Sequence, residues 1–385
     1  MTHTDYVTTG GRKRPRILHV VNALDGGGME RMLLSLVRAT AGDRLDHVIC
    51  TLRGPGPLAD SVPASVPLLP LEARGPNHTS GLRLAGILRR HRPGVVHARS
   101  WGAWADTAVA CALAGRPPLV LSFHGLQSDA GFSRRDRRRA RWLQFLCRRY
   151  ACVSHAGRDQ LRRELSVPAR RVAVIPNGVD PDRFAPPLPQ ARAAIRASLG
   201  VLPHECVIGT IGSMTPVKDH ATLLNAVRVC RGAGAKLRVL LVGDGPLMGE
   251  LRTQVRRDDL EAFVLFPGRR DDTPDLLGAM DVYVSSSRSE GMSNAVLEAM
   301  SVGLAVVATD VGDNARLLKR DRTGAIVPLR DSAALARAIM DLVNKTDQRR
   351  QWGTRARQLV LDHYTFGRTV ERYLSLYRSL LRPTR

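Results

Sequence analysis

Two glutamates, Glu290 and Glu298, are separated by seven residues where a strand-like run gives way to a helix-like one. Ser293 or Asn294 is suited to cap that helix, which would place Glu298 about one turn inside it. The N–H groups at a helix start attract anions and hold oxygen-rich ligands. The block is therefore a candidate ligand site. Taken alone, however, two acids at a helix start are more often a solvated segment that offsets the helix dipole.

A glycine run, Gly26–Gly28, follows the first strand-like segment and opens a helix. Glycines let the backbone come close to a ligand, and the N–H groups of the new helix favour an anion. A plain tight turn would have the same composition. The run is not Gly-x-Gly-x-x-Gly, and no acidic residue follows a second strand where a ribose would need it. This argues against a nicotinamide cofactor.

The stretch Arg134–Arg149 holds eight arginines and an apolar block. A basic amphipathic helix of this kind can lie on an anionic membrane surface. Alternatively, its apolar side packs on its own sheet while the arginines face water. Binding of nucleic acid is disfavoured, because only 4% of the chain is aromatic and the stretch lacks interleaved stacking residues. The candidates for membrane contact are Arg137, Arg138, Arg141, Trp142 and Phe145.

The composition describes a basic globular protein. Its 385 residues exceed what one hydrophobic core usually serves, so we expect two domains. Lys and Arg number 58 against 35 Asp and Glu, a net charge of +23. Such an excess indicates an anionic partner: nucleic acid, a membrane surface or a phosphorylated substrate. No apolar run is long enough to span a bilayer.

The N-terminal segment and the cysteines favour a cytoplasmic protein. Residues 1–15 are polar, then basic, and lack the apolar stretch of a secretory signal, so we expect a disordered lead-in. The six cysteines show neither Cys-x-x-Cys nor zinc-site spacing. We expect buried, reduced thiols, as in a reducing compartment.

The elements that must position these residues alternate between strand and helix. In the first half, strands are predicted at 16–21, 47–52, 95–98, 119–123, 150–153 and 172–175. Helices are predicted at 29–40, 82–92, 103–114, 134–149 and 156–165. Such alternation favours a parallel sheet with helices on both faces.

The pattern restarts after a proline-rich stretch that begins at Asp180, which is the best linker candidate. Strands follow at 207–211, 238–242, 263–266, 282–285 and 305–308, with helices at 220–231, 247–257, 295–301 and 333–343. The sequence thus predicts two doubly wound α/β domains, at 16–184 and 190–362. Ligands bind such sheets beyond the carboxyl ends of the strands, so two facing halves suggest a cleft between them.

The run at residues 287–309 resembles the signature of family 4 glycosyltransferases, which are retaining enzymes of the GT-B fold with two Rossmann-like domains. Other segments agree with the resemblance, which covers residues 16 to about 380. They are Gly26–Glu30 with Arg31 for the glycine loop, His124 for the active-site histidine, Asn177–Asp180 with Phe184 for the interdomain junction, and Pro216–His220 and Leu241–Pro246 for the donor domain. Family members return their C-terminal helix to the first domain, here at 365–382, where an apolar face is present.

The resemblance implies a role for each matching residue. Glu298 would bind the ribose hydroxyls, Glu290 would face the donor sugar, and His124 would lie beside the reacting centre. Lys218 would neutralise the leaving diphosphate, so His124, Glu290 and Lys218 form the catalytic set. The remaining donor-binding groups are Gly27 and Gly28 from the opposite domain and the backbone of Gly291, Met292, Ser293 and Asn294. Breaking a glycosyl–phosphate bond builds negative charge on the diphosphate, which N–H groups and a lysine stabilise.

One departure concerns the diphosphate. The family commonly places an arginine shortly before the lysine, whereas here Ser213-Met214-Thr215 occupies that loop. Ser213 can donate a hydrogen bond but carries no charge. Either neutral donors suffice, or Arg269 or Arg270 contributes from the adjacent loop.

No metal or other cofactor is expected beside the nucleotide-sugar co-substrate, since family members generally work without a metal. The most tempting metal-binding pattern, Asp180-Pro181-Asp182, lies beside a proline and is interpreted as a turn.

The sequence thus predicts a cytoplasmic, retaining glycosyltransferase of the hexosyltransferase type, with a UDP-sugar favoured over a GDP-sugar. A lipid-linked or saccharide acceptor in polysaccharide assembly, at the inner face of the cytoplasmic membrane, is expected. Two alternatives stay open: a soluble transferase acting on a small metabolite or sugar phosphate, and a non-catalytic protein that binds nucleotide sugars or nucleic acid.

Overall fold

The computed structural model describes residues 14–72, 79–125, 131–318 and 322–381. The predicted lead-in, residues 1–15, lies almost wholly outside these ranges. The strands are β1 (Arg16–Val21), β2 (Asp46–Thr51), β3 (Leu68–Pro70), β4 (Val95–Ala98), β5 (Leu119–Phe123), β6 (Arg149–Cys152), β7 (Val172–Val174), β8 (Cys206–Ile211), β9 (Leu237–Val242), β10 (Val264–Gly268), β11 (Val282–Ser285), β12 (Ala305–Thr309) and β13 (Gly324–Val327).

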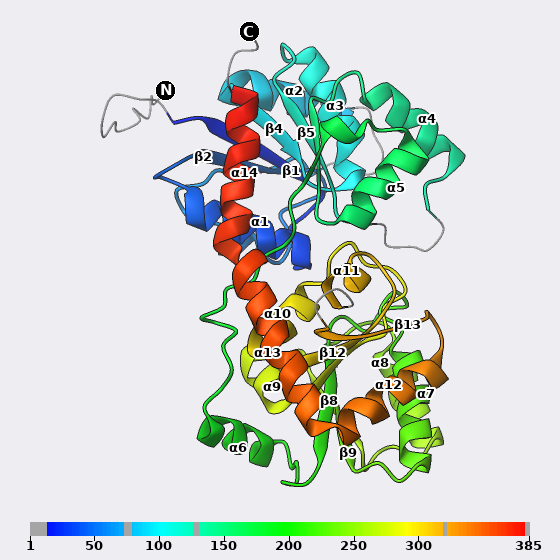
Figure 1. The fold of residues 1–385 in the computed structure, drawn as a ribbon. Coiled ribbons are helices and arrows are strands. Elements are labelled where there is room, and N and C mark those ends of the chain that lie inside the picture. The colour runs from blue at the N-terminus through cyan, green and yellow to red at the C-terminus, as the bar shows by residue number, and fades with distance from the viewer. Residues whose placement is uncertain (1–13, 73–78, 126–130, 319–321, 382–385) are drawn as a thin grey trace.

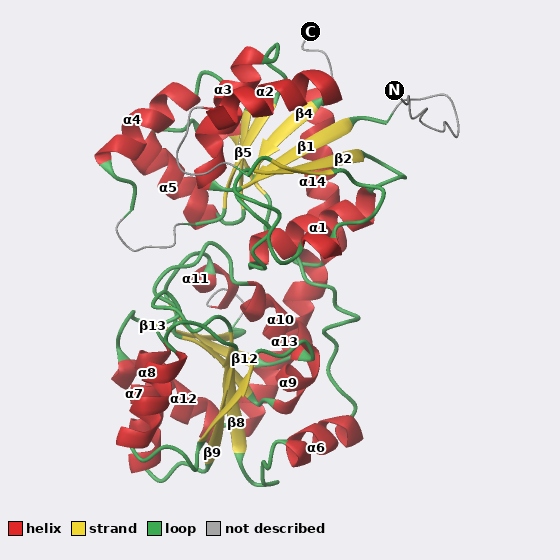
Figure 2. Ribbon diagram, turned by 180° about the vertical axis from the view of Figure 1, so that it is seen from behind, coloured by secondary structure: helices red, strands yellow, loops and turns green. Residues whose placement is uncertain are grey.

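The helices surround these strands (Figures 1 and 2). They are α1 (Gly28–Thr40), α2 (Thr79–His91), α3 (Trp104–Leu113), α4 (Arg134–Leu143), α5 (His155–Leu165), α6 (Pro189–Ser198), α7 (His220–Gly232), α8 (Met248–Arg257), α9 (Thr273–Ala279), α10 (Asn294–Val302), α11 (Asn314–Leu318), α12 (Ser332–Asn344), α13 (Thr346–His363) and α14 (Phe366–Leu381).

The described strands form two parallel sheets, one in each half of the molecule (Figure 2). The first has the order β3-β2-β1-β4-β5-β6-β7 and the second the order β10-β9-β8-β11-β12-β13. Both orders reverse direction at one point, between β1 and β4 and between β8 and β11. Ligands of open α/β sheets bind beyond the carboxyl ends of the strands at such a switch point. The two-domain α/β architecture predicted from the sequence is confirmed.

Two chain segments join the domains, and they pair with each other. The Val179 N–H donates to Tyr364 O at 2.9 Å, and the Phe366 N–H donates to Val179 O at 2.8 Å. A Cβ atom on Gly178 would lie 2.5 Å from Thr365 O, so this close approach requires glycine. The junction therefore holds the outgoing and returning chains side by side.

The returning helix, α14, packs on the sheet of the N-terminal domain (Figure 1). Its Tyr377 hydroxyl contacts His97 Nδ1 at 2.8 Å and accepts a hydrogen bond from Arg99 Nη2 at 3.0 Å. The fully buried Arg99 also lies over the Tyr373 ring, 4.7 Å from its centroid. A buried cation is costly unless it is hydrogen-bonded, so α14 completes the core of the other domain.

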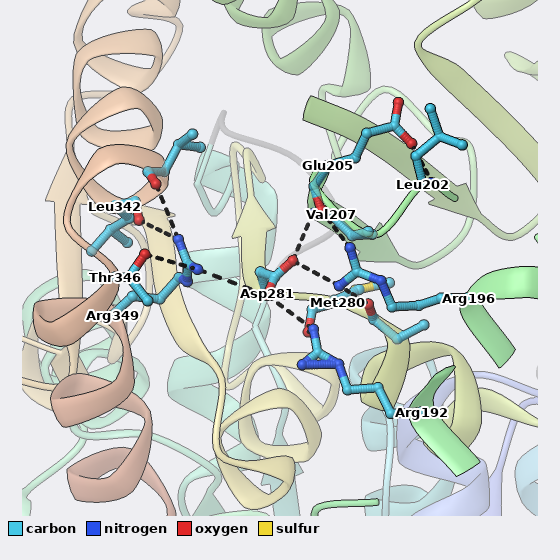
Figure 3. Close-up of polar contacts among 12 residues, drawn as sticks. Arg192, Arg196, Leu202, Glu205, Val207, Met280, Asp281, Leu342, Thr346 and Arg349 are labelled. Atoms are coloured by element: carbon cyan, nitrogen blue, oxygen red, sulfur yellow. Dashed lines mark hydrogen bonds and ion pairs between the residues drawn. The ribbon is translucent and has the colours of Figure 1, made fainter. Parts of the chain in front are cut away.

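One carboxylate, Asp281, anchors α6 and α13 at the amino edge of the second sheet (Figure 3). It accepts hydrogen bonds from Arg192 at 2.9 Å, Arg196 at 3.0 Å and the Val207 N–H at 2.8 Å, with Arg349 at 3.9 Å. Burial opposes its ionisation, but these donors hold the pKa of Asp281 below its ordinary value. A cavity of about 640 Å³ lies beside the cluster. This cavity opens at the amino edge of the sheet, whereas ligands of such sheets bind beyond the carboxyl ends of the strands. We therefore assign the Asp281 cluster a structural role.

Several elements were not predicted from the sequence, and one helix was predicted too long. The helix predicted over residues 134–149 ends at Leu143, because the chain turns there to enter β6. Leu143 O accepts from the N–H groups of Leu146 and Cys147 in that turn. The elements that the sequence did not predict are β3, β13, α6, α9, α11 and α13. All six cysteines are buried and unpaired.

The hydroxyl of Tyr377 provides a test of how α14 is held. Tyr377→Phe should lower the free energy of unfolding by about 1–3 kcal/mol, because buried Arg99 and His97 lose a partner. The matched control is Tyr373→Phe, one turn away on the same helix, whose hydroxyl finds no hydrogen-bond partner in the described ranges. Urea denaturation of both variants checks this, and equal losses would contradict the account.

Candidate active site

The helix α10 begins where β11 has ended and the chain has turned toward the other domain. Ser293 is its N-cap and accepts a hydrogen bond from the Val296 N–H at 3.4 Å. Of the two cap residues considered from the sequence, Ser293 therefore caps and Asn294 is the first helical residue. Glu298 lies about one turn inside, as predicted. This places the helix start and its N–H groups at the carboxyl edge of the sheet.

Burial destabilises the ionised form of the Glu298 side chain. Burial raises the pKa of Glu298 to about 7, although the guanidinium groups of Arg183 and Arg31 counteract part of the rise. Arg31 belongs to α1 and Arg183 to the interdomain junction. Charged groups from two other parts of the molecule thus act on this one carboxylate. Perturbed groups of this kind collect at functional sites.

Glu290 and Lys218 form an ion pair at the switch point of the second sheet. Lys218 Nζ donates to Glu290 Oε1 at 2.5 Å, and the Ser287 hydroxyl donates to the same oxygen at 2.9 Å. Both side chains are largely buried, with 28% of Lys218 and 12% of Glu290 exposed. Lys218 follows β8 and Glu290 follows β11, so the reversal in strand order brings them together.

The glycine loop of the N-terminal domain faces the start of α10. Asn294 Nδ2 lies 3.5 Å from Gly28 O, and a Cβ on Gly28 would come within 2.8 Å of that nitrogen. Gly27 is the N-cap residue of α1. The starts of two helices from different domains therefore confront each other. This arrangement can hold an anion between them.

His124 follows β5 and its backbone contacts the Glu290 loop. A Cβ on Gly291 would lie only 2.2 Å from His124 O, and one on Gly125 would lie 2.9 Å from the Gly291 nitrogen. The Nε2 atom of His124 is buried and has no hydrogen-bond partner among the residues described. Burial, assisted by the charge of Arg99, lowers the pKa of His124 to about 3. The imidazole is therefore neutral at physiological pH.

The loop that carries Ser213 packs on the loop that follows β9. The Met214 N–H donates to Asp244 O at 2.9 Å, and a Cβ on Gly245 would lie 2.7 Å from Met214 O. Ser213 itself is exposed at this edge. Arg269 is also exposed, directly after Gly268 at the end of β10.

The two arginines considered as substitutes for the missing clamp differ in their surroundings. Arg270 forms an ion pair with Asp272 at 2.5 Å. For Arg269, no acidic partner is present within the described residues. Arg269 is therefore the better candidate. Within the part of the chain that the structure describes, no hydrogen bond or ion pair joins Ser213 or Arg269 to Glu290 or Lys218, so their part in the site stays a prediction.

Asp180 forms a turn in the junction. Its Oδ1 accepts from the N–H groups of Asp182 and Arg183 at 3.0 and 3.3 Å, which agrees with the turn predicted there. Within the described ranges, no group of three or more His, Cys, Asp or Glu side chains could hold a metal ion.

The basic surface of α4 exposes two large aromatic side chains. Trp142 is 76% exposed and Phe145, which lies beyond the helix end, is 84% exposed. Arg138 and Arg141 are exposed as well. Arg137 is exposed too, but it is bound to the protein itself, since it donates to Phe132 O at 3.1 Å and pairs with Glu164 at 3.4 Å. No helix in the described part of the chain is long and apolar enough to cross a membrane.

Sequence reasoning missed three residues that shape the site. Ser287 orients Glu290, as described above. Asn177 donates from Nδ2 to Met292 O at 3.2 Å, across the domain boundary. Asp313 accepts from backbone N–H groups of α5, in the opposite domain. Asn177 stood in the junction motif and Asp313 follows a glycine at a strand end, but neither pattern names a partner.

Comparison with known proteins places the chain in a family. A model described as glycosyltransferase family 4 matches residues 26–183, and one described as glycosyl transferases group 1 matches residues 205–345. The chain is similar to the 2-deoxystreptamine N-acetyl-D-glucosaminyltransferase of Streptomyces fradiae, with 30% identity over 91% of this chain and 90% of that protein.

Two further relatives cover nearly the whole chain. The UDP-Gal:alpha-D-GlcNAc-diphosphoundecaprenol alpha-1,3-galactosyltransferase of Escherichia coli is 26% identical over 91% of this chain and 93% of that protein. The crystal structure of Anabaena Alr3699/HepE in complex with UDP and glucose shares the fold, with a TM-score of 0.82 and 23% identity over 94% of this chain and 99% of that one. The fold is thus GT-B, and the chain belongs to the family 4 glycosyltransferases.

Proposed function

We propose that this glycosyltransferase moves a hexose from a nucleoside-diphosphate sugar to a lipid-linked or saccharide acceptor, with retention of the anomeric configuration. A UDP-sugar is favoured over a GDP-sugar. The observation that carries the proposal is the pair Glu290 and Glu298 flanking the start of α10, opposite Gly28 and His124 of the other domain. The E. coli relative, whose name specifies a UDP-sugar and a diphosphoundecaprenol acceptor, supports the choice.

The donor would lie along the start of α10. Glu298 is suited to the ribose, because two hydroxyl donors would satisfy a carboxylate that burial leaves poorly solvated. The N–H groups at residues 291–294, the glycine loop and Lys218 would hold the diphosphate. Ser213 and Arg269 would add a neutral and a charged donor from the neighbouring loops.

The reaction needs charge stabilisation at both ends of the breaking bond. Negative charge grows on the diphosphate, where Lys218 and the helix start stabilise it. A diphosphate there would compete with Glu290 for Lys218, which would leave the Glu290 carboxylate available to the positive charge that grows on the sugar. His124, neutral and with an unpartnered Nε2, would contact the sugar as a hydrogen-bonding group rather than as a cation. We propose that no metal is required, because lysine and N–H groups supply the stabilisation.

A second candidate acceptor is a small soluble molecule. The S. fradiae relative is named for 2-deoxystreptamine, which is such a molecule. Transfer from radiolabelled UDP-sugars to organic-extractable lipid would support the lipid-linked acceptor. Transfer into the aqueous phase with soluble sugars or aminocyclitols alone would replace it.

The location that fits a lipid-linked acceptor is the inner face of the cytoplasmic membrane. The exposed Trp142 and Phe145 beside the arginines of α4 would insert between anionic headgroups. The protein would then be cytoplasmic and peripherally bound. Nucleic acid is not a proposed partner.

The two glutamates should fail differently on substitution. Glu298→Gln should weaken donor binding about 10- to 100-fold, because a charged acceptor is lost, and excess donor should restore the rate. Glu290→Gln and His124→Ala should lower kcat without rescue by donor, since their partner develops charge in the transition state. Initial rates against donor concentration measure both effects.

The matched control for these variants is Glu250→Gln, an exposed acid in the first turn of α8. It makes the same change of charge at another helix start of the same domain, and should leave both parameters unchanged. If both site variants keep wild-type kinetics, the glutamates are solvated residues at a helix start and the proposal fails.

The raised pKa of Glu298 predicts a stability difference that depends on pH. Between its ordinary value near 4.5 and about 7, the folded protein binds a proton that the unfolded chain releases. Stability is therefore lost as pH rises through this window. Glu298→Gln should thus be more stable than wild type by about 1–3 kcal/mol at pH 8, and this advantage should shrink at pH 5. Thermal unfolding at both pH values measures it; an advantage that is constant with pH would contradict it.

Membrane binding should depend on the free arginines of α4. Changing Arg138, Arg139 and Arg141 together to Ser should weaken binding to anionic vesicles about 100-fold, at about 1 kcal/mol per charge. Arg137 is left intact because it contacts Phe132 and Glu164.

The control for membrane binding changes three exposed donor-domain arginines, Arg337, Arg350 and Arg355, to Ser. It removes the same charge and should retain binding. Vesicle sedimentation at low and high salt measures both variants. Wild-type protein that stays unbound at low salt would show that the arginines of α4 are only a solvated face.

A further inference from the structure

The first turn of α5 in the N-terminal domain is capped by a carboxylate from the other domain. Asp313 Oδ2 accepts from the His155 N–H at 2.8 Å, and Oδ1 accepts from the Ala156 N–H at 2.9 Å. The next N–H, at Gly157, donates to the helix's own cap residue, Ser154, at 3.0 Å. A carboxylate is favoured here by charge-assisted hydrogen bonds and by the positive end of the helix dipole.

Asp313 is fixed within its own domain by the loop between β12 and α11. It is 7% exposed and directly precedes α11, where its backbone oxygen accepts from the Leu317 N–H at 3.0 Å. The neighbouring side chain, Asn314, donates to Thr309 O at 3.0 Å. The position of Asp313 is thus fixed in two ways. Its own loop holds its backbone in the C-terminal domain, and α5 of the N-terminal domain binds its carboxylate.

The same loop also packs against the backbone of the segment that carries Glu290. Gly312, with a φ of +56°, lies so close that a Cβ there would be 2.6 Å from Gly291 O and 2.8 Å from Glu290 O. Gly291 also lies against His124 O, which a Cβ on Gly291 would approach to 2.2 Å. A series of contacts therefore runs from α5 through the Asp313 carboxylate to Gly312, and from the Gly312 backbone to Gly291 and His124.

We propose that Asp313 is a positioning residue that latches the two domains in the arrangement needed for transfer. The inference rests on the proposed function, since it concerns the same site. Asp313 touches no reacting atom; it acts by setting how far Gly291 and Glu290 lie from His124. The paired junction at Val179 joins the domains at one point, and the latch joins them at a second.

The energetic consequence lies in orientation rather than in donor affinity. Of the proposed nucleotide contacts, those of Glu298, Lys218 and the start of α10 lie within the C-terminal domain, and the glycine loop reaches the diphosphate from the N-terminal domain. The sugar must also meet His124 in the other domain. Loss of the latch should therefore spare nucleotide binding and reduce turnover, because a misplacement of about 1 Å costs about 100-fold in rate.

The test uses the full-length protein with Asp313→Asn and Asp313→Ala. Turnover, donor KM, UDP binding by calorimetry and the radius of gyration by X-ray scattering are measured for each. We expect kcat to fall about 10-fold or more and the radius of gyration to rise, with UDP affinity changed less than about 3-fold. Asn should be milder than Ala, because its single carbonyl oxygen can still accept one N–H.

Two control variants separate the latch from helix capping as such. Ser154→Ala removes the cap that α5 receives from its own domain. Asp331→Asn alters a carboxylate that caps α12 within one domain, where it accepts from the Ala334 N–H at 2.8 Å. Both should lose stability as the Asp313 variants do, and neither should change kcat or the radius of gyration.

Wild-type turnover and radius in the Asp313 variants would overturn the proposal. An equal loss of turnover in Ser154→Ala would overturn it too, since α5 stability would then explain the effect. If wild-type protein transfers no sugar from any donor, the proposed function fails, but scattering still decides whether Asp313 holds the domains together.

Discussion

The geometry of the candidate site depends on a contact between backbones of the two domains. A Cβ atom on Gly291 would lie 2.2 Å from His124 O, one on Gly125 would lie 2.9 Å from Gly291 N, and one on Gly312 would lie 2.6 Å from Gly291 O. Three glycines thus allow loops from both domains to touch without side chains between them. A side chain at Gly125 or Gly291 would push the Glu290 loop away from His124, and one at Gly312 would clash with the backbone of Glu290 and Gly291.

Two carboxylates at opposite edges of the second sheet show how environment separates structure from function. Asp281 is surrounded by donors that hold its pKa below the ordinary value, so it stabilises the fold. Glu298 is desolvated without comparable compensation, and burial raises its pKa to about 7. A protein retains such a costly group where a ligand can satisfy it. The surroundings of Glu298 are therefore a better candidate for the active site than the cavity beside Asp281.

The sequence predicted those elements whose apolar pattern is strong. The strands β1, β4 and β5 match their predicted ranges residue for residue, because buried parallel strands form short continuous apolar runs. The three-residue β3 has too few residues for a pattern, and α13 buries only Gly353, Ala356 and Val360 in 18 residues, so its helical period is faint. The helix predicted over residues 134–149 is longer than α4, because the arginine-rich pattern continues beyond the turn at Leu143.

For the candidate site, the sequence indicated residues but not their partners. Glu290, Glu298 and Gly28 carry local signals, since a helix start needs a cap and a close approach needs glycine. The contact between Asp313 and α5 joins residues 158 positions apart. An aspartate before a short helix predicts a cap for that helix, and only the fold shows that its carboxylate caps a helix in the other domain. Local chemistry thus sets what each residue can do, while the topology decides which group it meets.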